Sequence, residues 1–258
     1  MFIVFFMLCL LSSSAYAEKI TIAAAADLKY AMDKIVKVFK KNHPLEDLEV
    51  IFGSSGKIFA QIQQGAPYDL YFAADISYPQ ELSKNGFASS DVKLYAIGKI
   101  VLWSTTHNAS KMTLTDLKDT KIKHIAIANP KHAPYGKRAQ EALEATKVWN
   151  DIKSKIVYGD NIVQTAQFVQ SGNADIGIIA LSIAMNPELS NQGAHWPIPD
   201  NLHKPLEQAY IITKRAANNK LARKFADFME TTPAREIMIK YGFVLPKERD
   251  QTKNPGKK

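Results

Sequence analysis

The chain has 258 residues, of which 46% are hydrophobic, and a formal net charge of +8. This length supplies enough apolar side chains for a buried core, and the only cysteine is Cys9, so no intramolecular disulfide can form. The basic residues are scattered and follow no aromatic-basic motif, which argues against nucleic acid as a partner. None of the six histidines stands at a metal-ligand spacing. A basic surface of this kind can steer an anionic ligand.

Residues 1–17 have the pattern of an export signal. They are apolar, carry no charged side chain and end in Ser12-Ser13-Ser14-Ala15-Tyr16-Ala17. Small residues spaced in this way are typical of a cleavage site, and the apolar run is too short to span a bilayer. We therefore predict a signal peptide over 1–17 and a periplasmic protein. Whether the segment is cleaved or kept as an anchor stays open.

Strand-like and helix-like patterns alternate along the rest of the chain. Short apolar runs indicate strands, and apolar residues at helical spacing indicate helices. The predicted elements, in chain order, are strand 19–25, helix 28–41, strand 48–52, helix 58–64, strand 69–74, helix 79–85, a β-rich stretch 95–104, strand 125–128, helix 136–146, strand 156–158, helix 163–171, strand 176–180, strand 208–213, helix 220–231 and helix 234–241. Alternation of this kind predicts an α/β fold of mostly parallel sheets flanked by helices.

The two long β-rich stretches, 95–104 and 208–213, each separate an earlier strand–helix series from a later one. They are the natural crossings between two lobes. We predict that residues 18–97 plus 210–247 form the first lobe and residues 98–209 the second, with a ligand cleft between them. Residues 248–258 form a basic tail, which we expect to be flexible.

Two early loops have the character of an anion site. Thr21-Ile22-Ala23-Ala24-Ala25-Ala26-Asp27-Leu28 and Val50-Ile51-Phe52-Gly53-Ser54-Ser55-Gly56-Lys57 both follow an apolar run and precede a predicted helix. A helix N-terminus offers unpaired N–H groups and a partial positive charge, so two of them facing one cleft can bind a small oxyanion. The second loop is not a nucleotide-binding P-loop, because Ile51 and Ile58 stand where that motif needs Gly and Ser or Thr.

These loops and several later segments resemble the substrate-binding proteins of molybdate ABC importers, which are type II periplasmic binding proteins. The resemblance covers roughly residues 19–246, and it depends on the order and spacing of the segments together. The segments are Ala24-Ala25-Ala26-Asp27-Leu28, Phe52-Gly53-Ser54-Ser55-Gly56, Gln64-Gly65-Ala66-Pro67-Tyr68-Asp69-Leu70, Ala73-Ala74-Asp75, Ala128-Asn129-Pro130-Lys131-His132-Ala133-Pro134-Tyr135-Gly136, Ala174-Asp175-Ile176-Gly177-Ile178 and Tyr241-Gly242-Phe243.

The resemblance implies a binding protein and not an enzyme, with no cofactor and no metal cation. Its ligand would be molybdate, and tungstate as well, held as a dehydrated tetrahedral anion. The positions that match the family's ligand-binding residues are Ala26, Asp27, Ser55, Tyr135 and Ile162. Ser55 would donate its hydroxyl, and Tyr135 and Ile162 their backbone N–H groups. The protein would be a monomer that delivers the anion to a membrane permease.

Two residues depart from the family pattern. Asp27 stands where many members have serine, and Ala180 where some members supply a tyrosine hydroxyl. Because a carboxylate would repel a dianion, Asp27 either turns back to cap the helix over 28–41 or accepts a proton from a protonated oxyanion such as phosphate or arsenate. With Ala180 lacking a donor, Tyr135 is expected to close the site. An alternative of another class is a secreted hydrolase of phosphate or sulfate esters.

Overall fold

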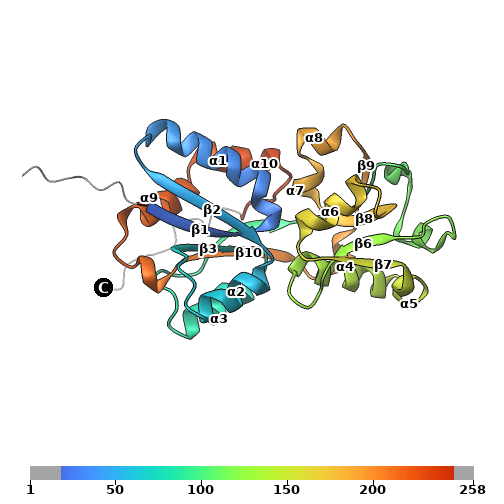
Figure 1. The fold of residues 1–258 in the computed structure, drawn as a ribbon, viewed down its shortest axis with the longest axis horizontal. Coiled ribbons are helices and arrows are strands. Elements are labelled where there is room, and N and C mark those ends of the chain that lie inside the picture. The colour runs from blue at the N-terminus through green and yellow to red at the C-terminus, as the bar shows by residue number, and fades with distance from the viewer. Residues whose placement is uncertain (1–18, 247–258) are drawn as a thin grey trace, which may run out of the picture.

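The computed structural model describes residues 19–246, and these residues form two lobes side by side (Figure 1). The signal segment over 1–17 and the basic tail over 248–258 lie outside the described residues. Each lobe is built on one five-stranded sheet with helices on both faces. Among the described residues, no helix combines the length and the apolar character needed to cross a membrane.

The sheet of the first lobe has the strand order β2-β1-β3-β10-β4. Its strands are β1 (Lys19–Ala25), β2 (Asp47–Gly53), β3 (Leu70–Ala73), β4 (Lys93–Gly98) and β10 (Leu206–Ile212). One face is covered by α1 (Lys29–Asn42), α9 (Lys220–Phe228) and α10 (Thr232–Lys240), and the other by α2 (Ser55–Gln63) and α3 (Ser77–Lys84) (Figure 1). Alternate residues of β1 serve the two faces: Ile22 and Ala24 pack toward α1, and Ala23 packs toward α2.

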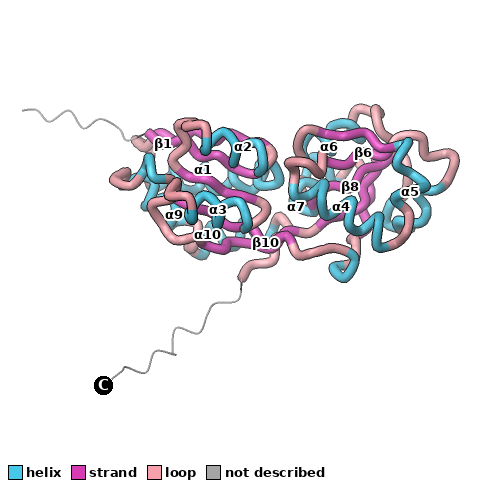
Figure 2. The backbone as a smooth tube through the Cα atoms, turned by 90° about the horizontal axis from the view of Figure 1, so that it is seen from below, coloured by secondary structure: helices cyan, strands magenta, loops and turns pink. Residues whose placement is uncertain are grey.

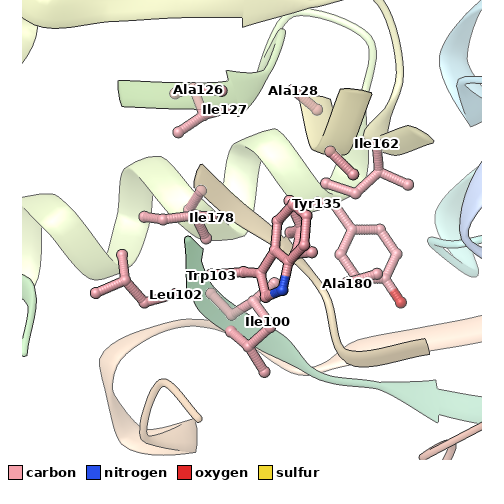
Figure 3. Packing of buried hydrophobic residues seen from close by; sticks show 14 of the residues in the cluster. Ile100, Leu102, Trp103, Ala126, Ile127, Ala128, Tyr135, Ile162, Ile178 and Ala180 are labelled. Atoms are coloured by element: carbon pink, nitrogen blue, oxygen red, sulfur yellow. The ribbon is translucent and has the colours of Figure 1, made fainter. Parts of the chain in front are cut away.

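The sheet of the second lobe has the order β7-β6-β8-β5-β9. Its strands are β5 (Ile100–Ser104), β6 (Ile125–Ala128), β7 (Ile156–Gly159), β8 (Ile176–Ala180) and β9 (Ala194–Pro197). Its helices are α4 (Pro134–Ala145), α5 (Trp149–Ile152), α6 (Ile162–Gln170), α7 (Leu181–Ala184) and α8 (Pro187–Ser190). The core is centred on the buried Trp103 ring, and Tyr135 and Ile162 lie at its edge (Figure 3).

Both sheets are mixed. In the first lobe β1 is parallel to β2 and β3, whereas β10 is antiparallel to β3 and β4. In the second lobe β6 is parallel to β7 and β8, whereas β5 is antiparallel to β8 and β9. The predicted two-lobed α/β fold is confirmed, and the antiparallel pairings come from the strands next to the crossings between the lobes.

The chain crosses between the lobes at the ends of β4 and β10. The β-rich stretch over 95–104 is two strands in different sheets, separated by Lys99 alone. The return strand β10 begins at Leu206 and lies at the junction of the lobes (Figure 2). Residues 206–209, which the sequence analysis placed in the second lobe, therefore pair in the first sheet. The polar pair Glu207 and Gln208 interrupts the apolar run there and hides the start of the strand.

Three predicted strands have the observed bounds, namely 19–25, 125–128 and 176–180. Five helices begin one to three residues earlier than predicted, and two of these are α2, which begins at Ser55, and α4, which begins at Pro134. Apolar periodicity marks a helix only where one face meets the core. The first turns of α2 and α4 face the space between the lobes, so they carry Ser, Gly and Pro, and the periodic pattern starts later.

Candidate functional site

A small cavity lies between the lobes. Both lobes line it, and all five predicted ligand-binding residues are among its walls. The lining residues are Ala25, Ala26, Asp27, Gly53, Ser54, Ser55 and Ala74 from the first lobe, and Ala133, Pro134, Tyr135 and Ile162 from the second. The structure thus brings together residues that the sequence separates by more than a hundred positions.

Three helices and one short turn begin at this cavity. They are α2, α4, α6 and the 3₁₀ turn Ala26–Leu28. The first N–H groups of each helix have no carbonyl partner within the helix and carry its partial positive charge. The described residues that line the cavity include no Lys, Arg or His. Any attraction for an anion therefore comes from backbone dipoles and hydroxyl donors.

Ser55 is held in place so that its hydroxyl proton stays free. The N–H of Ala74 donates to Ser55 Oγ at 3.0 Å, and the buried Tyr71 hydroxyl donates to the Ser55 carbonyl at 2.7 Å. Oγ accepts this hydrogen bond, and no acceptor for its own proton is found among the described residues, so the hydroxyl is available as a donor. Ser55 is 1% exposed, so an acceptor for that proton has to lie in the cavity.

The second lobe contributes two backbone donors. In α6 the side chain of Asn161 accepts from the N–H groups of Val163 and Gln164, both at 3.0 Å, and leaves the Ile162 N–H unused. In α4 the first residue is Pro134, which has no N–H, so the first donor of that helix is Tyr135. The helix starts tightly against β6, because a Cβ at Gly136 would lie 1.8 Å from the Ala128 carbonyl oxygen.

Asp27 does not cap the helix that follows it, so the capping hypothesis is wrong. Neither the turn Ala26–Leu28 nor α1 has a side-chain cap. Instead Asp27 Oδ2 accepts from the Tyr135 hydroxyl at 2.9 Å and from Gln208 Nε2 at 2.8 Å. Gln208 Nε2 also donates to the Tyr135 oxygen at 2.9 Å, and the Tyr95 hydroxyl donates to Gln208 Oε1 at 2.7 Å. We call these four residues the Asp27 cluster.

The Asp27 cluster is buried and joins the lobes, since Tyr135 belongs to the second and the other three residues to the first. Burial raises the pKa of Asp27 to about 6, although the hydrogen bonds from Gln208 and Tyr135 and the backbone N–H of Asp27 itself lower it. Burial also raises the pKa of Tyr135 and of Tyr95 well above 10, with Asp27 adding to both shifts. The second carboxyl oxygen, Asp27 Oδ1, is buried without a hydrogen-bond partner in the described structure.

Sequence reasoning missed Gln208 and Tyr95. A signal existed for Gln208, because it is a polar residue in the predicted apolar strand 208–213. A polar side chain that is buried in a strand needs a hydrogen-bond partner.

Tyr135 was expected to close the site with its hydroxyl, but that hydroxyl bonds to Asp27 and points away from the Trp103 ring (Figure 3). Ala180 lies beside Tyr135 at the end of β8 and is not among the residues that line the cavity (Figure 3).

A second set of contacts joins the lobes at the exposed edge of the cavity, and we call them the rim contacts. Ser54 Oγ and His132 Nδ1 are hydrogen-bonded at 2.8 Å, and the Gly56 N–H donates to the His132 carbonyl at 2.9 Å. Lys57 forms an ion pair with Asp160. The pKa of His132 is lowered by burial and by the nearby Lys57. With both sets of contacts formed, the structure shows the closed arrangement of the lobes.

Over residues 19–246, no three or more His, Cys, Asp or Glu side chains gather as a cation site.

The chain matches the family described as bacterial extracellular solute-binding protein over residues 20–244. Two relatives share about a third of its residues over most of both chains. The molybdate-binding protein ModA of Azotobacter vinelandii is 35% identical over 92% of this chain and 94% of its own length. ModA of Rhodobacter capsulatus is 36% identical over 91% of each chain. The chain therefore belongs to the bacterial extracellular solute-binding proteins, which are non-enzymatic components of transporters.

The fold agrees with that membership. The solved structure of the periplasmic molybdate-binding protein of Azotobacter vinelandii has a TM-score of 0.83 and 32% identity, and covers 88% of this chain and 99% of its own. The sulfate-binding protein SubI of Mycobacterium tuberculosis has a TM-score of 0.74 at 16% identity, covering 90% and 88%, and so shares the fold. Family membership leaves the ester-hydrolase alternative without support.

Proposed function

We propose that this protein captures molybdate, and tungstate as well, in the cavity between its lobes and delivers it to the permease of an ABC importer. The observation that carries the proposal is a small cavity bordered by three helix N-termini and a serine hydroxyl, with no basic side chain among the described residues that line it. Fixed N–H dipoles can replace the water shell of a fully dehydrated anion. The identities of the ModA relatives support the choice of anion.

In the proposed site the donors come from both lobes, so the anion stabilises closure. Ser55 donates its hydroxyl, and Ala26, Asp27, Tyr135 and Ile162 donate backbone N–H groups. Selectivity over sulfate follows from size, because a rigid cavity whose donors are fixed by the fold leaves a smaller anion of similar charge with longer hydrogen bonds. The rim contacts then cover the bound anion.

Delivery follows from the role of the family. An exported monomer that closes over the anion presents both lobes in one fixed arrangement, which a permease can distinguish from the open form. Export through the signal peptide over 1–17 and a periplasmic location complete this proposal.

The test is calorimetric titration of residues 18–258 with molybdate, tungstate, sulfate and phosphate. We expect one-to-one binding of the first two anions and none of the last two. Ser55→Ala removes a hydrogen bond to a charged group, which costs about 1.5–3 kcal/mol and weakens binding about 10- to 150-fold. Ser83→Ala, at an exposed position of α3, is the control and leaves affinity unchanged. Equal affinities of Ser55→Ala and wild type would remove this hydroxyl from the site.

One observation favours a second ligand class. The free, buried oxygen of Asp27 could accept a proton from a protonated oxyanion such as hydrogen phosphate or hydrogen arsenate. In that case phosphate binds in the titration, molybdate does not, and affinity falls as pH rises through the second pKa of the ligand.

A further inference from the structure

The hydrogen positions in the Asp27 cluster are fixed by its own geometry. Tyr95 donates to Gln208 Oε1, which orients the amide so that Nε2 faces Asp27 and Tyr135. The two N–H groups of Nε2 then serve Asp27 Oδ2 and the Tyr135 oxygen. Because the Tyr135 oxygen accepts from Gln208, its single proton goes to Asp27 Oδ2. Oδ2 thus accepts two hydrogen bonds, and a proton on this carboxyl belongs on Oδ1.

Oδ1 is the one polar atom of the cluster left without a partner in the described structure. It belongs to a residue that is 1% exposed and lines the cavity. An ionised carboxylate with a bare oxygen is costly when buried, and a dianion in the same cavity would add repulsion. A proton on Oδ1 removes both costs and turns the oxygen into a donor.

We propose that Asp27 is protonated in the anion-loaded protein and donates a hydrogen bond from Oδ1 to the bound oxyanion. This inference rests on the proposed function. The proton comes from solvent and binds to Oδ1, the anion stays unprotonated, and binding of one dianion takes up one proton. In its neutral form the carboxyl group donates a hydrogen bond to the anion, as a serine hydroxyl in this position would.

The titratable groups that face the Asp27 carboxyl are the two tyrosines of the cluster. Tyr135 and Tyr95 face the carboxyl and stay protonated, since burial raises the pKa of each. The helices α6 and α7, which pack on the turn of Asp27, carry no titratable side chain, and Ser182 of α7 bonds only the Asp27 carbonyl. On α1, Lys29 is paired with Asp33. On β2, the acidic residues Asp47 and Glu49 are exposed.

The pH range follows from Asp27 itself. Its pKa is raised by burial to about 6, so the carboxyl is mostly ionised at pH 7.5 and mostly neutral at pH 5. Loading with a dianion then takes up about 0.9 or more protons at pH 7.5 and about 0.1 at pH 5. Affinity falls about tenfold for each pH unit above 6.

The first measurement is calorimetric titration of the wild-type protein with molybdate in buffers of different ionisation enthalpy at pH 7.5. The slope of the observed enthalpy against buffer enthalpy gives the number of protons taken up, and we expect about one. This measurement needs no variant, so it stands even if a substitution fails to fold.

The second measurement uses Asp27→Asn, whose amide donates without carrying a charge. We expect its affinity to be independent of pH between 6 and 8, with no proton uptake. From a wild-type pKa of about 6, the variant binds about 100-fold more tightly than wild type at pH 8 and about equally at pH 5. The control is Asp47→Asn, at the far end of β2 and about 20 Å from Gly53 in the cavity wall. It keeps the wild-type pH dependence and proton uptake.

The outcomes separate this inference from the function it rests on. Binding of molybdate with no proton uptake, or a loss of affinity in Asp27→Asn that is the same at every pH, overturns the inference and leaves the proposed function standing. Binding of phosphate alone with a proton supplied by the ligand also overturns it. Failure of the wild-type protein to bind any of the four anions overturns both.

Discussion

The Asp27 cluster and the rim contacts both join the two lobes across the cavity, but they differ in their contact with water. In the cluster, Asp27 and Gln208 are 1% and 0% exposed. At the rim, the side chains of Lys57 and Asp160 are 48% and 52% exposed. A buried hydrogen bond has no water to replace it, whereas exposed partners return to water at little cost. We therefore expect the cluster to contribute more than the rim to the free energy that holds the lobes closed.

The two regions also differ in how they arise from the chain. The rim contacts come from the loops and first turns that start α2, α4 and α6, next to the cavity. The cluster joins Asp27 to Tyr135 and Gln208, which lie 108 and 181 residues away. It forms only once both sheets and the crossing strands β4 and β10 are in place. We therefore expect changes in the cluster to affect folding and binding together, and changes at the rim to affect folding less than changes in the cluster.

The largest effect is expected from Gln208→Leu. It leaves three buried groups short of a partner, namely the hydroxyls of Tyr95 and Tyr135 and the carboxyl of Asp27. At about 1 kcal/mol or more for each group, urea unfolding should show a loss of about 3 kcal/mol or more. Ser54→Ala, the rim counterpart, loses one hydrogen bond to His132 and about 1 kcal/mol or less. Equal losses in the two variants would contradict the difference drawn here.

The second effect is a pH-dependent stability difference between wild type and Asp27→Asn without ligand. Because burial raises the pKa of Asp27 from 3.8 to about 6, the folded protein holds this proton more tightly than the unfolded chain. Stability from this group is present below pH 4 and is lost as pH rises through 6, by about 3 kcal/mol in all. Unfolding should therefore be measured at pH 4 and at pH 8. From the lower to the higher pH, the unfolding free energy of Asp27→Asn should rise by about this amount relative to that of wild type. The same difference at both pH values would place the carboxyl outside the buried cluster.

The sequence allowed the site residues to be predicted where they lie in loops with a recognisable local pattern. Small residues mark the loops before the helices, and the family resemblance selects Ser55, Tyr135 and Ile162 in or beside those loops. The fold places all three, with Ala26 and Asp27, around one cavity. Short loops after buried strands can be predicted because the strand before the loop and the helix after it each have a recognisable local pattern. The roles of these residues in binding an anion stay a prediction.

The sequence could not give the direction of the Asp27 side chain. Local preference favours aspartate as a helix cap, but the side chain instead bonds two distant partners, Tyr135 and Gln208, which no local pattern connects to it. The same limit applies to the crossing at Lys99, where two strands of different sheets follow each other without a break in hydrophobicity. Tertiary pairing decides both features, and only the folded chain shows it.

A third test compares two glycines that allow the lobes to meet. At Gly98 a Cβ would lie 2.3 Å from the Tyr135 hydroxyl and 2.6 Å from Gln208 Nε2, and at Gly56 it would lie 2.7 Å from the His132 carbonyl oxygen. Overpacking of this kind costs about 1–3 kcal/mol, or about 5- to 150-fold in affinity.

Gly98→Ala should lower both anion affinity and the unfolding free energy of the free protein, since Gln208 belongs to the same lobe as Gly98. Gly56→Ala should lower affinity more than stability, because its clash is with His132 of the other lobe and is relieved when the lobes part. Titration and urea unfolding of both variants check this. A loss of stability in Gly56→Ala as large as in Gly98→Ala would mean that the lobes stay closed without ligand.

The smallest effect is expected from Lys57→Met, which breaks the exposed ion pair with Asp160 and keeps the length of the side chain. An exposed pair contributes about 1 kcal/mol or less, so affinity should fall by about fivefold or less, mainly through faster release of the anion. Salt screens exposed charges, so the difference between variant and wild type should vanish at about 1 M salt. Stopped-flow release at low and high salt measures both. A difference that persists at high salt would mean that Lys57 acts in some way other than through its exposed ion pair with Asp160.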